Sequence, residues 1–337
     1  MRNNAYLLLL YFWVIIAFSC QRMTTDSEEV VSKLPEKRVE VPAFNADSAF
    51  YFIEKQVNFG PRVPNSKAHR LTGDYLVKKL QSYGAEVIEQ QFEATTFDNE
   101  TLYLRNIIAG FFPEKRKRIL LAAHWDTRPY ADKDEDEARR NEPIDGANDG
   151  ASGVAVLLEI ARIIHEYPVK PEVGIDIIFF DGEDWGELNS GLKKPTPPEL
   201  DSWWCLGSQY WSKNKHIPHY SAYYGILVDM VGARNAQFYI EGLSSDYASK
   251  VVIKIWDWGN VLGYSNLFIY DKKQGITDDH KYVNEIARIP MVNIVHYDQE
   301  YGYFGDFHHT HKDNLELIDR NVLKGVGETL VYVIYHE

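Results

Sequence analysis

The sequence has few cysteines and no excess of basic residues. Its two cysteines, Cys20 and Cys205, can form at most one disulfide and cannot build a cysteine-rich zinc site. Lys and Arg number 36 against 49 Asp and Glu, which gives a formal net charge of -13. A chain this acidic gains nothing from the counterion release that drives nucleic-acid binding. We therefore expect no nucleic-acid partner.

Three catalytic sequence patterns are also missing. The absence of H-E-x-x-H excludes the helix-borne zinc protease, and the absence of G-x-S-x-G and G-x-x-x-x-G-K-[ST] excludes the hydrolase elbow and the P-loop. What is present is an ordinary globular composition of 45% hydrophobic and 25% charged residues over 337 positions. This composition can bury a core and excludes wholesale disorder.

An apolar run opens the chain. Residues 5–18 follow Arg2 and carry no charge, and they are too short for a comfortable membrane span of ~20 residues. They fit a secretory signal over residues 1–19. The run ends in Ala-Phe-Ser-Cys, which is similar to a lipoprotein signal with Cys20 lipidated as the mature N-terminus. An uncleaved anchor is the alternative. We expect an exported protein, periplasmic or membrane-anchored only through this N-terminus.

The rest of the chain divides simply. Residues 20–45 are polar, contain two prolines and show no clear period, which is typical of a tether. Residues 46–337 contain no second linker and no internal repeat. We expect them to form one domain, and the sequence leaves its oligomeric state open.

Hydrophobic periodicity predicts alternating helices and strands in this domain. Apolar positions at helical spacing predict helices over 48–57, 67–83, 153–166 and 314–336. Alternating or continuous apolar residues predict strands over 85–94, 102–112, 119–123, 173–180, 224–231 and 290–297. This order favours an α/β single-domain three-layer sandwich, with a mostly parallel mixed sheet flanked by helices. The ligand site of such a sheet lies beyond the carboxyl ends of its strands.

Acidic and imidazole residues follow the ends of the predicted strands. They are His124, Asp126, Asp149, Glu183, Asp184, Asp229, His308, His309 and His311. Each one alone has an ordinary explanation, such as a loop histidine, a helix cap or a solvated strand end. Together at one sheet edge they form a mixed histidine and carboxylate set, which suits a catalytic zinc with an open position.

The adjacent pair Glu183 and Asp184 suggests a division of roles. Consecutive side chains of extended backbone point to opposite sides. One of the two carboxylates can therefore bind a metal while the other faces the substrate as a general acid or base.

Several segments, in order along the chain, resemble the animal-type (type II) glutaminyl cyclases in their bacterial branch, within the zinc aminopeptidase-like superfamily. These segments are NFGPRVPNSKAH (58–69), AAHWDT (122–127), GANDGASG (146–153), FFDGED (179–184), VDMVGARNAQF (228–238), TDDHKY (277–282) and HHTHKDN (308–314). The resemblance implies cyclisation of an N-terminal Gln, and more slowly Glu, of peptides or proteins to pyroglutamate, with release of ammonia or water.

The resemblance also implies a role for each matching residue. One zinc ion per chain would be held by Asp149, Asp184 and His309, with the fourth position open for substrate. Glu183 would be the general acid/base, and Asp229 and Asp278 would form a hydrogen-bonded acidic pair beside it.

The sequence departs from the family pattern beside the zinc histidine. His308 stands where many relatives have a tryptophan, which leaves open which of His308 and His309 binds the metal. Replacement pocket walls are expected from aromatic and apolar residues nearby: Trp185, Ile276, Tyr303 and Phe304. The inserted segment 185–206 contributes two further tryptophans, Trp203 and Trp204, and loops of this length tend to be functional.

A two-zinc aminopeptidase is the main alternative. Its five ligand positions correspond to metal-capable residues: His124, Asp149, Asp184, Asp229 and His309. His124, Asp126 and His308 are therefore either supporting residues or ligands of a second metal. The motif TDDH (277–280) and the segment 228–238 favour the cyclase. A lipid-anchored binding protein that has lost its chemistry is disfavoured, because no ligand and no base is missing.

Overall fold

The computed structural model describes residues 39–188 and 194–337. Cys20, the expected signal 1–19 and most of the expected tether 20–45 lie outside these residues. The expectations of export and lipidation therefore stay predictions.

A six-stranded sheet lies at the centre of the described part, in the order β1-β2-β4-β3-β5-β8. Its strands are β1 (Glu86–Thr95), β2 (Thr101–Phe111), β3 (Arg118–His124), β4 (Gly174–Phe180), β5 (Tyr224–Asp229) and β8 (Met291–Val295). β3 is parallel to β4 and β5, and β5 is parallel to β8. β1 and β2 pair antiparallel, and β2 pairs antiparallel with β4. The expected mostly parallel mixed sheet is confirmed.

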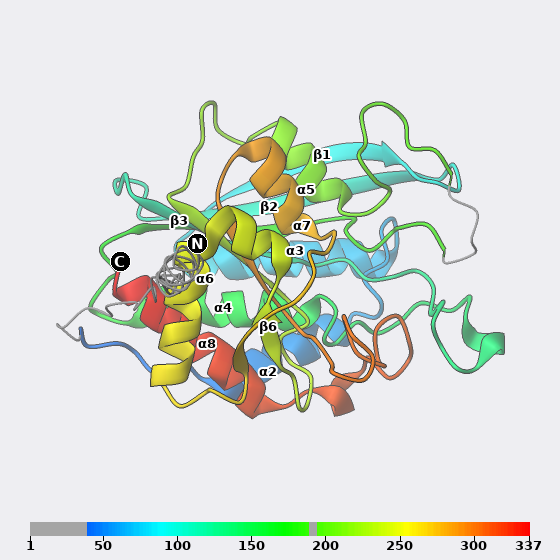
Figure 1. Ribbon diagram of the computed structural model, residues 1–337. Coiled ribbons are helices and arrows are strands. Elements are labelled where there is room, and N and C mark those ends of the chain that lie inside the picture. Colours follow the sequence, from blue (N-terminus) through cyan, green and yellow to red (C-terminus); the bar gives the residue numbers. More distant parts are fainter. Residues whose placement is uncertain (1–38, 189–193) are drawn as a thin grey trace, which may run out of the picture. The chain divides into compact units, whose positions relative to one another are not determined.

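Helices cover both faces of this sheet, as Figure 1 shows. Its central strands β4 and β5 are therefore buried along their whole length. The longer helices are α2 (Ala46–Val57), α3 (Lys67–Ser82), α4 (Ala151–Glu166), α6 (Gly242–Val261) and α8 (Arg320–Tyr335). The shorter helices are α5 (Leu206–Lys213) and α7 (Asp279–Tyr282), and α7 runs directly into a π-helix, Val283–Ala287. Residues of β3 alternate between the two layers: Leu121 packs in the larger apolar cluster with α4 and α8, and Leu120 packs in the smaller cluster with Trp211 of α5.

The last helix begins later than the sequence pattern predicts. α8 starts at Arg320 and not at 314, because Asp319 accepts a hydrogen bond from the Asn321 N–H and caps it. The residues before this cap form only a short 3-10 helix, Leu315–Leu317. α5, α6 and α7 were not predicted, and neither was a small parallel pair of strands, β6 (Phe238–Ile240) and β7 (Phe268–Lys272).

Among the described residues, no helix is both long enough and apolar enough to cross a bilayer.

Candidate active site

Apart from His311, the singled-out acidic and imidazole residues lie at the carboxyl-terminal edge of the parallel strands. His311 instead lies 2.7 Å from Asp134 and lines a different cavity. His124 and Asp229 are the last residues of β3 and β5. Asp278 is the residue that caps the start of α7. Seven of the singled-out residues line one cavity of about 400 Å³: Asp149, Glu183, Asp184, Asp229, Asp278, His308 and His309. The topology of the sheet therefore brings them together.

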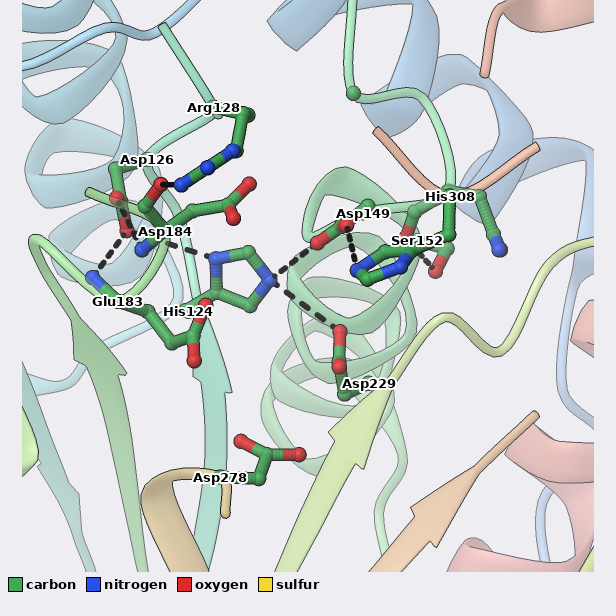
Figure 2. Close-up of polar contacts among 12 residues, drawn as sticks. His124, Asp126, Arg128, Asp149, Ser152, Glu183, Asp184, Asp229, Asp278 and His308 are labelled. Carbon is green, nitrogen blue, oxygen red and sulfur yellow. Dashed lines mark hydrogen bonds and ion pairs between the residues drawn. The ribbon is translucent and has the colours of Figure 1, made fainter. Parts of the chain in front are cut away.

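Asp126 shapes the turn that follows β4. Its two carboxylate oxygens accept hydrogen bonds from the backbone N–H groups of Glu183 and Asp184, each at 3.1 Å, as Figure 2 shows. Asp126 is fully buried. Asp126 therefore orients the turn that carries Glu183 and Asp184. Because both of its oxygens accept these hydrogen bonds, it is not placed as a metal ligand.

Asp313 does the same for the turn that carries Asp149. Its oxygens accept hydrogen bonds from the N–H groups of Asn148 at 2.6 Å and Asp149 at 3.0 Å. The buried guanidinium of Arg62 donates to the carbonyl of Gly146 at 2.7 Å in the same turn. The position of Asp149 is thus set by groups that are distant in sequence.

Glu183 and Asp184 face different neighbours. Asp184 Oδ1 lies 3.0 Å from Nε2 of His309. Glu183 Oε1 instead accepts a hydrogen bond from the thiol of Cys205 at 3.0 Å. The two consecutive carboxylates therefore face an imidazole on one side and a buried thiol on the other, although they lie in the bend that follows β4 and not in extended strand.

His309 is oriented from several directions. Its Nδ1 lies 3.5 Å from Oδ1 of Asp132, and the ring of Trp204 stacks on it with 5.8 Å between centroids and a 9° interplanar angle. Ring nitrogens of His308 and His309 and an oxygen of Asp149 lie within 4.8 Å of one another. Metal-binding histidines are commonly oriented by a carboxylate on the ring nitrogen that faces away from the metal. Asp132 stands in that relation to His309.

His308 lies beside His309 but is engaged differently. Lys133 Nζ lies 2.6 Å from His308 Nδ1, and His308 Nε2 lies 3.8 Å from Oδ2 of Asp149. Burial lowers the pKa of His308 well below its usual range, and the charges of His309 and Lys133 lower it further. Only Nε2 of this neutral ring is available. The contacts favour His309 as the ligand and leave His308 within reach of Asp149.

His124 joins two of the carboxylates, as Figure 2 shows. Its Nε2 lies 2.9 Å from Oδ1 of Asp149 and 3.3 Å from Oδ1 of Asp229, and its Nδ1 lies 3.5 Å from Oδ1 of Asp126. Burial would lower the pKa of His124, but these three carboxylates raise it well above its usual range. His124, Asp149 and Asp229 form a second set of donors within 4.8 Å of one another. Asp149 thus belongs to two donor sets, as a two-metal site requires.

Raised pKa values mark the carboxyl groups beside these sets. Burial raises the pKa of Glu183 well above its usual range, with His124 opposing and Asp184 and Asp278 adding to the effect. Burial also raises the pKa of Asp229 to about 7, against the effect of His124 and with that of Asp278. A carboxyl group whose pKa is raised in this way can serve as a general acid or base.

The resemblance implies a hydrogen bond between Asp229 and Asp278. The structure shows no such bond between these two described residues. Asp278 Oδ2 instead accepts from the side-chain amide of Asn293 at 2.6 Å, and Oδ1 accepts from the backbone N–H of Asp279 at 2.5 Å. With both oxygens engaged, Asp278 influences Asp229 through its charge.

The expected pocket walls are distributed unevenly. Phe304 lines the main cavity, while Ile276 and Tyr303 line an adjoining cavity of about 660 Å³. Trp185, expected in the wall, is 8% exposed and packs in a separate apolar cluster with residues of β1 and β2. Trp204 lines the main cavity instead. The expectation for Trp185 is corrected accordingly.

Sequence reasoning missed Asp132 and Lys133 and did not assign Trp204. All three line the main cavity. Asp132 and Lys133 lie in an irregular acidic loop after β3, where no hydrophobic period fixes the direction of a side chain. The only signal for Trp204 was its position in a long inserted loop.

The donor groups fit a zinc ion. Nitrogen and oxygen ligands of tetrahedral zinc lie ~2.0–2.2 Å from the metal and therefore roughly 3.3 Å from one another. His309 and Asp184 present atoms 3.0 Å apart. Asp184 Oδ2 is buried and finds no hydrogen-bond partner among the described residues. A cation held by Asp149, Asp184 and His309 would compensate these buried carboxylates.

Solved bacterial structures resemble this chain over most of its length. The glutaminyl cyclase of Bacteroides thetaiotaomicron is 48% identical, with a TM-score of 0.84, and the match covers 88% of this chain and 100% of that one. The glutaminyl cyclase of Tannerella forsythia is 50% identical, with a TM-score of 0.83 and the same coverage. A Zn-dependent exopeptidase from Parabacteroides distasonis is 49% identical, with a TM-score of 0.84, again over 88% and 100% of the two chains.

Curated relatives are more distant. Aminopeptidase YwaD of Bacillus subtilis is 25% identical over 89% of this chain, which spans 59% of YwaD. The glutaminyl-peptide cyclotransferase of Dictyostelium discoideum is 21% identical over 95% of this chain and 94% of its own length. The resemblance to the glutaminyl cyclases is confirmed. Residues 106–334, which include all the cavity-lining carboxylates and histidines, match Peptidase family M28, and the chain belongs to this family.

Proposed function

We propose that the chain is a zinc-dependent glutaminyl-peptide cyclotransferase. It converts N-terminal Gln, and more slowly Glu, of peptides and proteins to pyroglutamate, with release of ammonia or water. The observation that carries the proposal is the placement of Glu183, a carboxyl group of raised pKa, in the same cavity as Asp149, Asp184 and His309. The similarity to two bacterial glutaminyl cyclases at 48% and 50% identity supports it.

The chemistry follows from the side chains. The α-amine of the substrate attacks the side-chain amide carbon of its own Gln, so a C–N bond forms and the bond to the amide nitrogen breaks. Glu183 removes a proton from the amine and delivers it to the departing nitrogen, which leaves as ammonia. The free α-amine has a pKa near ~8, so a carboxyl group with a raised pKa is a suitable partner. The surrounding carboxylates hold the amine in place before it is deprotonated.

Asp149, Asp184 and His309 would hold the zinc ion. When bound, the zinc supplies polarisation of the amide carbonyl and stabilises charge at its oxygen. Because the nucleophile belongs to the substrate itself, no second metal is needed to generate a hydroxide. One zinc ion per chain is therefore part of the proposal.

A two-zinc aminopeptidase is the second candidate. The donor set of His124, Asp149 and Asp229, which shares Asp149 with the first set, favours it. So does the similarity to the Zn-dependent exopeptidase of Parabacteroides distasonis and to aminopeptidase YwaD. The two functions differ in product, since one releases ammonia and the other releases a free amino acid.

Two peptides separate these candidates. The purified protein is incubated with a Gln-initiated peptide and with a Leu-initiated peptide of otherwise equal sequence, and both are followed by mass spectrometry. We expect the Gln peptide to lose the mass of ammonia, a chelator to stop this loss, and the Leu peptide to stay intact. Release of free leucine with no loss of ammonia would establish the aminopeptidase.

We further propose that the protein is exported and anchored through lipidated Cys20. The uncharged run 5–18 and the small residue before Cys20 support this. Metabolic labelling with a fatty-acid analogue tests it: the label is expected on the wild-type protein and not on Cys20→Ala, and an unlabelled wild-type protein would refute lipidation.

A further inference from the structure

The cavity that holds Glu183 continues into a second one. Thr277 and Phe304 line both cavities, so the two are adjoining. The walls of the second cavity come from residues 272–277, which begin at the end of β7, and from residues 297–304, which follow β8. A peptide whose first residue lies beside Glu183 can extend its next residues along this second cavity.

The two cavities are lined by different ionisable groups. The main cavity is lined by one lysine, Lys133, and by seven carboxylates: Asp132, Asp149, Glu183, Asp184, Glu187, Asp229 and Asp278. Among the described residues that line the second cavity there are two lysines, Lys272 and Lys273, and no carboxylate. We call this second cavity the lysine groove. In a chain of net charge -13, two lysines without an acid in the same wall form a distinct local environment.

Both lysines have aspartate partners outside the groove, and these aspartates are exposed. Lys272 Nζ lies 2.8 Å from Asp246, whose side chain is 64% exposed, and Lys273 Nζ lies 2.7 Å from Asp271, whose side chain is 62% exposed. Exposed ion pairs of this kind contribute little and exchange readily with other partners. A carboxylate that enters the groove can therefore be bound by these two ammonium groups.

The walls of the lysine groove are held in place without a ligand. The hydroxyl of Tyr303 donates to the carbonyl of Gln274 at 3.1 Å and joins the two walls. The N–H of Ile276 donates to Glu241 Oε1 at 3.0 Å. Lys273 Nζ lies 5.0 Å from the centre of the Tyr297 ring and 4.5 Å from that of the Tyr239 ring, and both contacts are attractive. Such a preformed wall lowers the ordering cost of binding a peptide.

We propose that the lysine groove is a subsite for an acidic side chain in the peptide segment that follows the N-terminal residue. This inference rests on the proposed function and names its preferred substrates: Gln-initiated peptides with Asp or Glu within the next few residues. The α-ammonium is attracted by the carboxylates of the main cavity, and the acidic side chain is attracted by Lys272 and Lys273. The two attractions together set the direction in which the peptide lies.

A peptide series tests this inference. Gln-initiated pentapeptide amides carry alanine at positions 2 to 5, or a single Glu moved through these positions. We expect at least one Glu-containing peptide to have a KM about threefold to tenfold lower than the all-alanine peptide, with kcat unchanged. Added salt should weaken this preference, because the Lys272 side chain is 52% exposed and its attraction to a peptide carboxylate is screened.

Variants identify the groups responsible. The double variant Lys272→Gln/Lys273→Gln should abolish the preference and leave the all-alanine peptide unaffected. The matched control Lys67→Gln/Lys78→Gln removes the same charge from exposed positions of α3 and should keep the preference. Equal KM values for acidic and neutral peptides, or a preference that survives in the double groove variant, would overturn the inference.

Failure of the proposed function is a separate result. Calorimetric binding of the same peptides to the wild type and to the double groove variant reports the preference without turnover. If no Gln peptide is cyclised, the proposed function fails, while the subsite stands or falls on whether acidic peptides bind more tightly through Lys272 and Lys273.

Discussion

The thiol of Cys205 donates a hydrogen bond to Glu183 Oε1 over 3.0 Å. Burial raises the pKa of this thiol well above its usual range, and the charge of Glu183 adds to the effect, so the thiol stays protonated and can donate. The backbone N–H of Cys205 also donates to the carbonyl of Glu183 at 2.9 Å. Together these bonds hold Glu183 in one orientation beside Asp278.

Cys205→Ala should lower kcat up to about tenfold with little change in KM, because a hydrogen bond of this kind contributes roughly 0.5–1.5 kcal/mol. Cys205→Ser should recover much of the loss, since its hydroxyl can donate to the same oxygen. Steady-state kinetics with a Gln peptide measures both effects. An alanine variant with wild-type kcat would show that Glu183 does not depend on the thiol.

Asp132→Asn should weaken zinc binding about tenfold to hundredfold, because the carboxylate that orients His309 loses its charge. Competition with a metal chelator measures this affinity. Glu135→Gln is the matched control, since it removes a negative charge from an exposed position of the same loop. Equal zinc affinity in the Asp132 variant and this control would show that Asp132 does not contribute to zinc binding.

Glu183→Gln should keep the bound metal and lose turnover by about a hundredfold to ten-thousandfold, the usual contribution of a general acid/base. The amide has nearly the shape of the carboxylate but cannot accept the proton of the amine. Metal analysis and peptide mass spectrometry on one preparation measure the two properties. Cyclisation at the wild-type rate would show that the base is another residue.

Glu241 should make stability depend on pH in acid. Burial would raise the pKa of this carboxyl, but the hydrogen bond and charge of His280 and the hydrogen bonds of Ser244 lower it to about 2, below its ordinary value of 4.5. A depressed folded-state pKa contributes stability above about pH 4.5 that is lost as the pH falls toward about 2. The difference between these two pKa values corresponds to at most about 3 kcal/mol of folding free energy.

Urea unfolding at about pH 6 and about pH 3 checks this window. The wild type should lose more stability between the two values than Glu241→Gln, which carries no titrating group at this position. Equal losses in both proteins would mean that Glu241 does not titrate in this range.

The sheet and the helices that cover it could be predicted because hydrophobic periodicity reports burial directly. The continuous apolar run 224–231 contains β5, and 153–166 contains nearly all of α4. β6 and β7 were not predicted, because they span only Phe238–Ile240 and Phe268–Lys272 and are too short to show a hydrophobic period. The start of α8 was misplaced because a polar cap at Asp319 decides it, not the apolar pattern.

The sequence could predict those site residues that lie at the ends of strands. His124, Asp184 and Asp229 follow strands, so topology alone brings them to one edge. Asp132 and Trp204 could not be assigned, because their contacts with His309 depend on how two irregular loops fold back over the strand ends. Trp185 was misplaced because its position next to Asp184 does not determine which side its ring packs on.

A single zinc ion should be sufficient for cyclisation in this cavity. Metal-free protein is titrated with zinc while the release of ammonia from a Gln peptide is followed at each addition. We expect activity to rise with the first equivalent and to reach its plateau at one zinc ion per chain. Activity that requires two zinc ions per chain, or release of free amino acids in place of ammonia, would contradict this expectation.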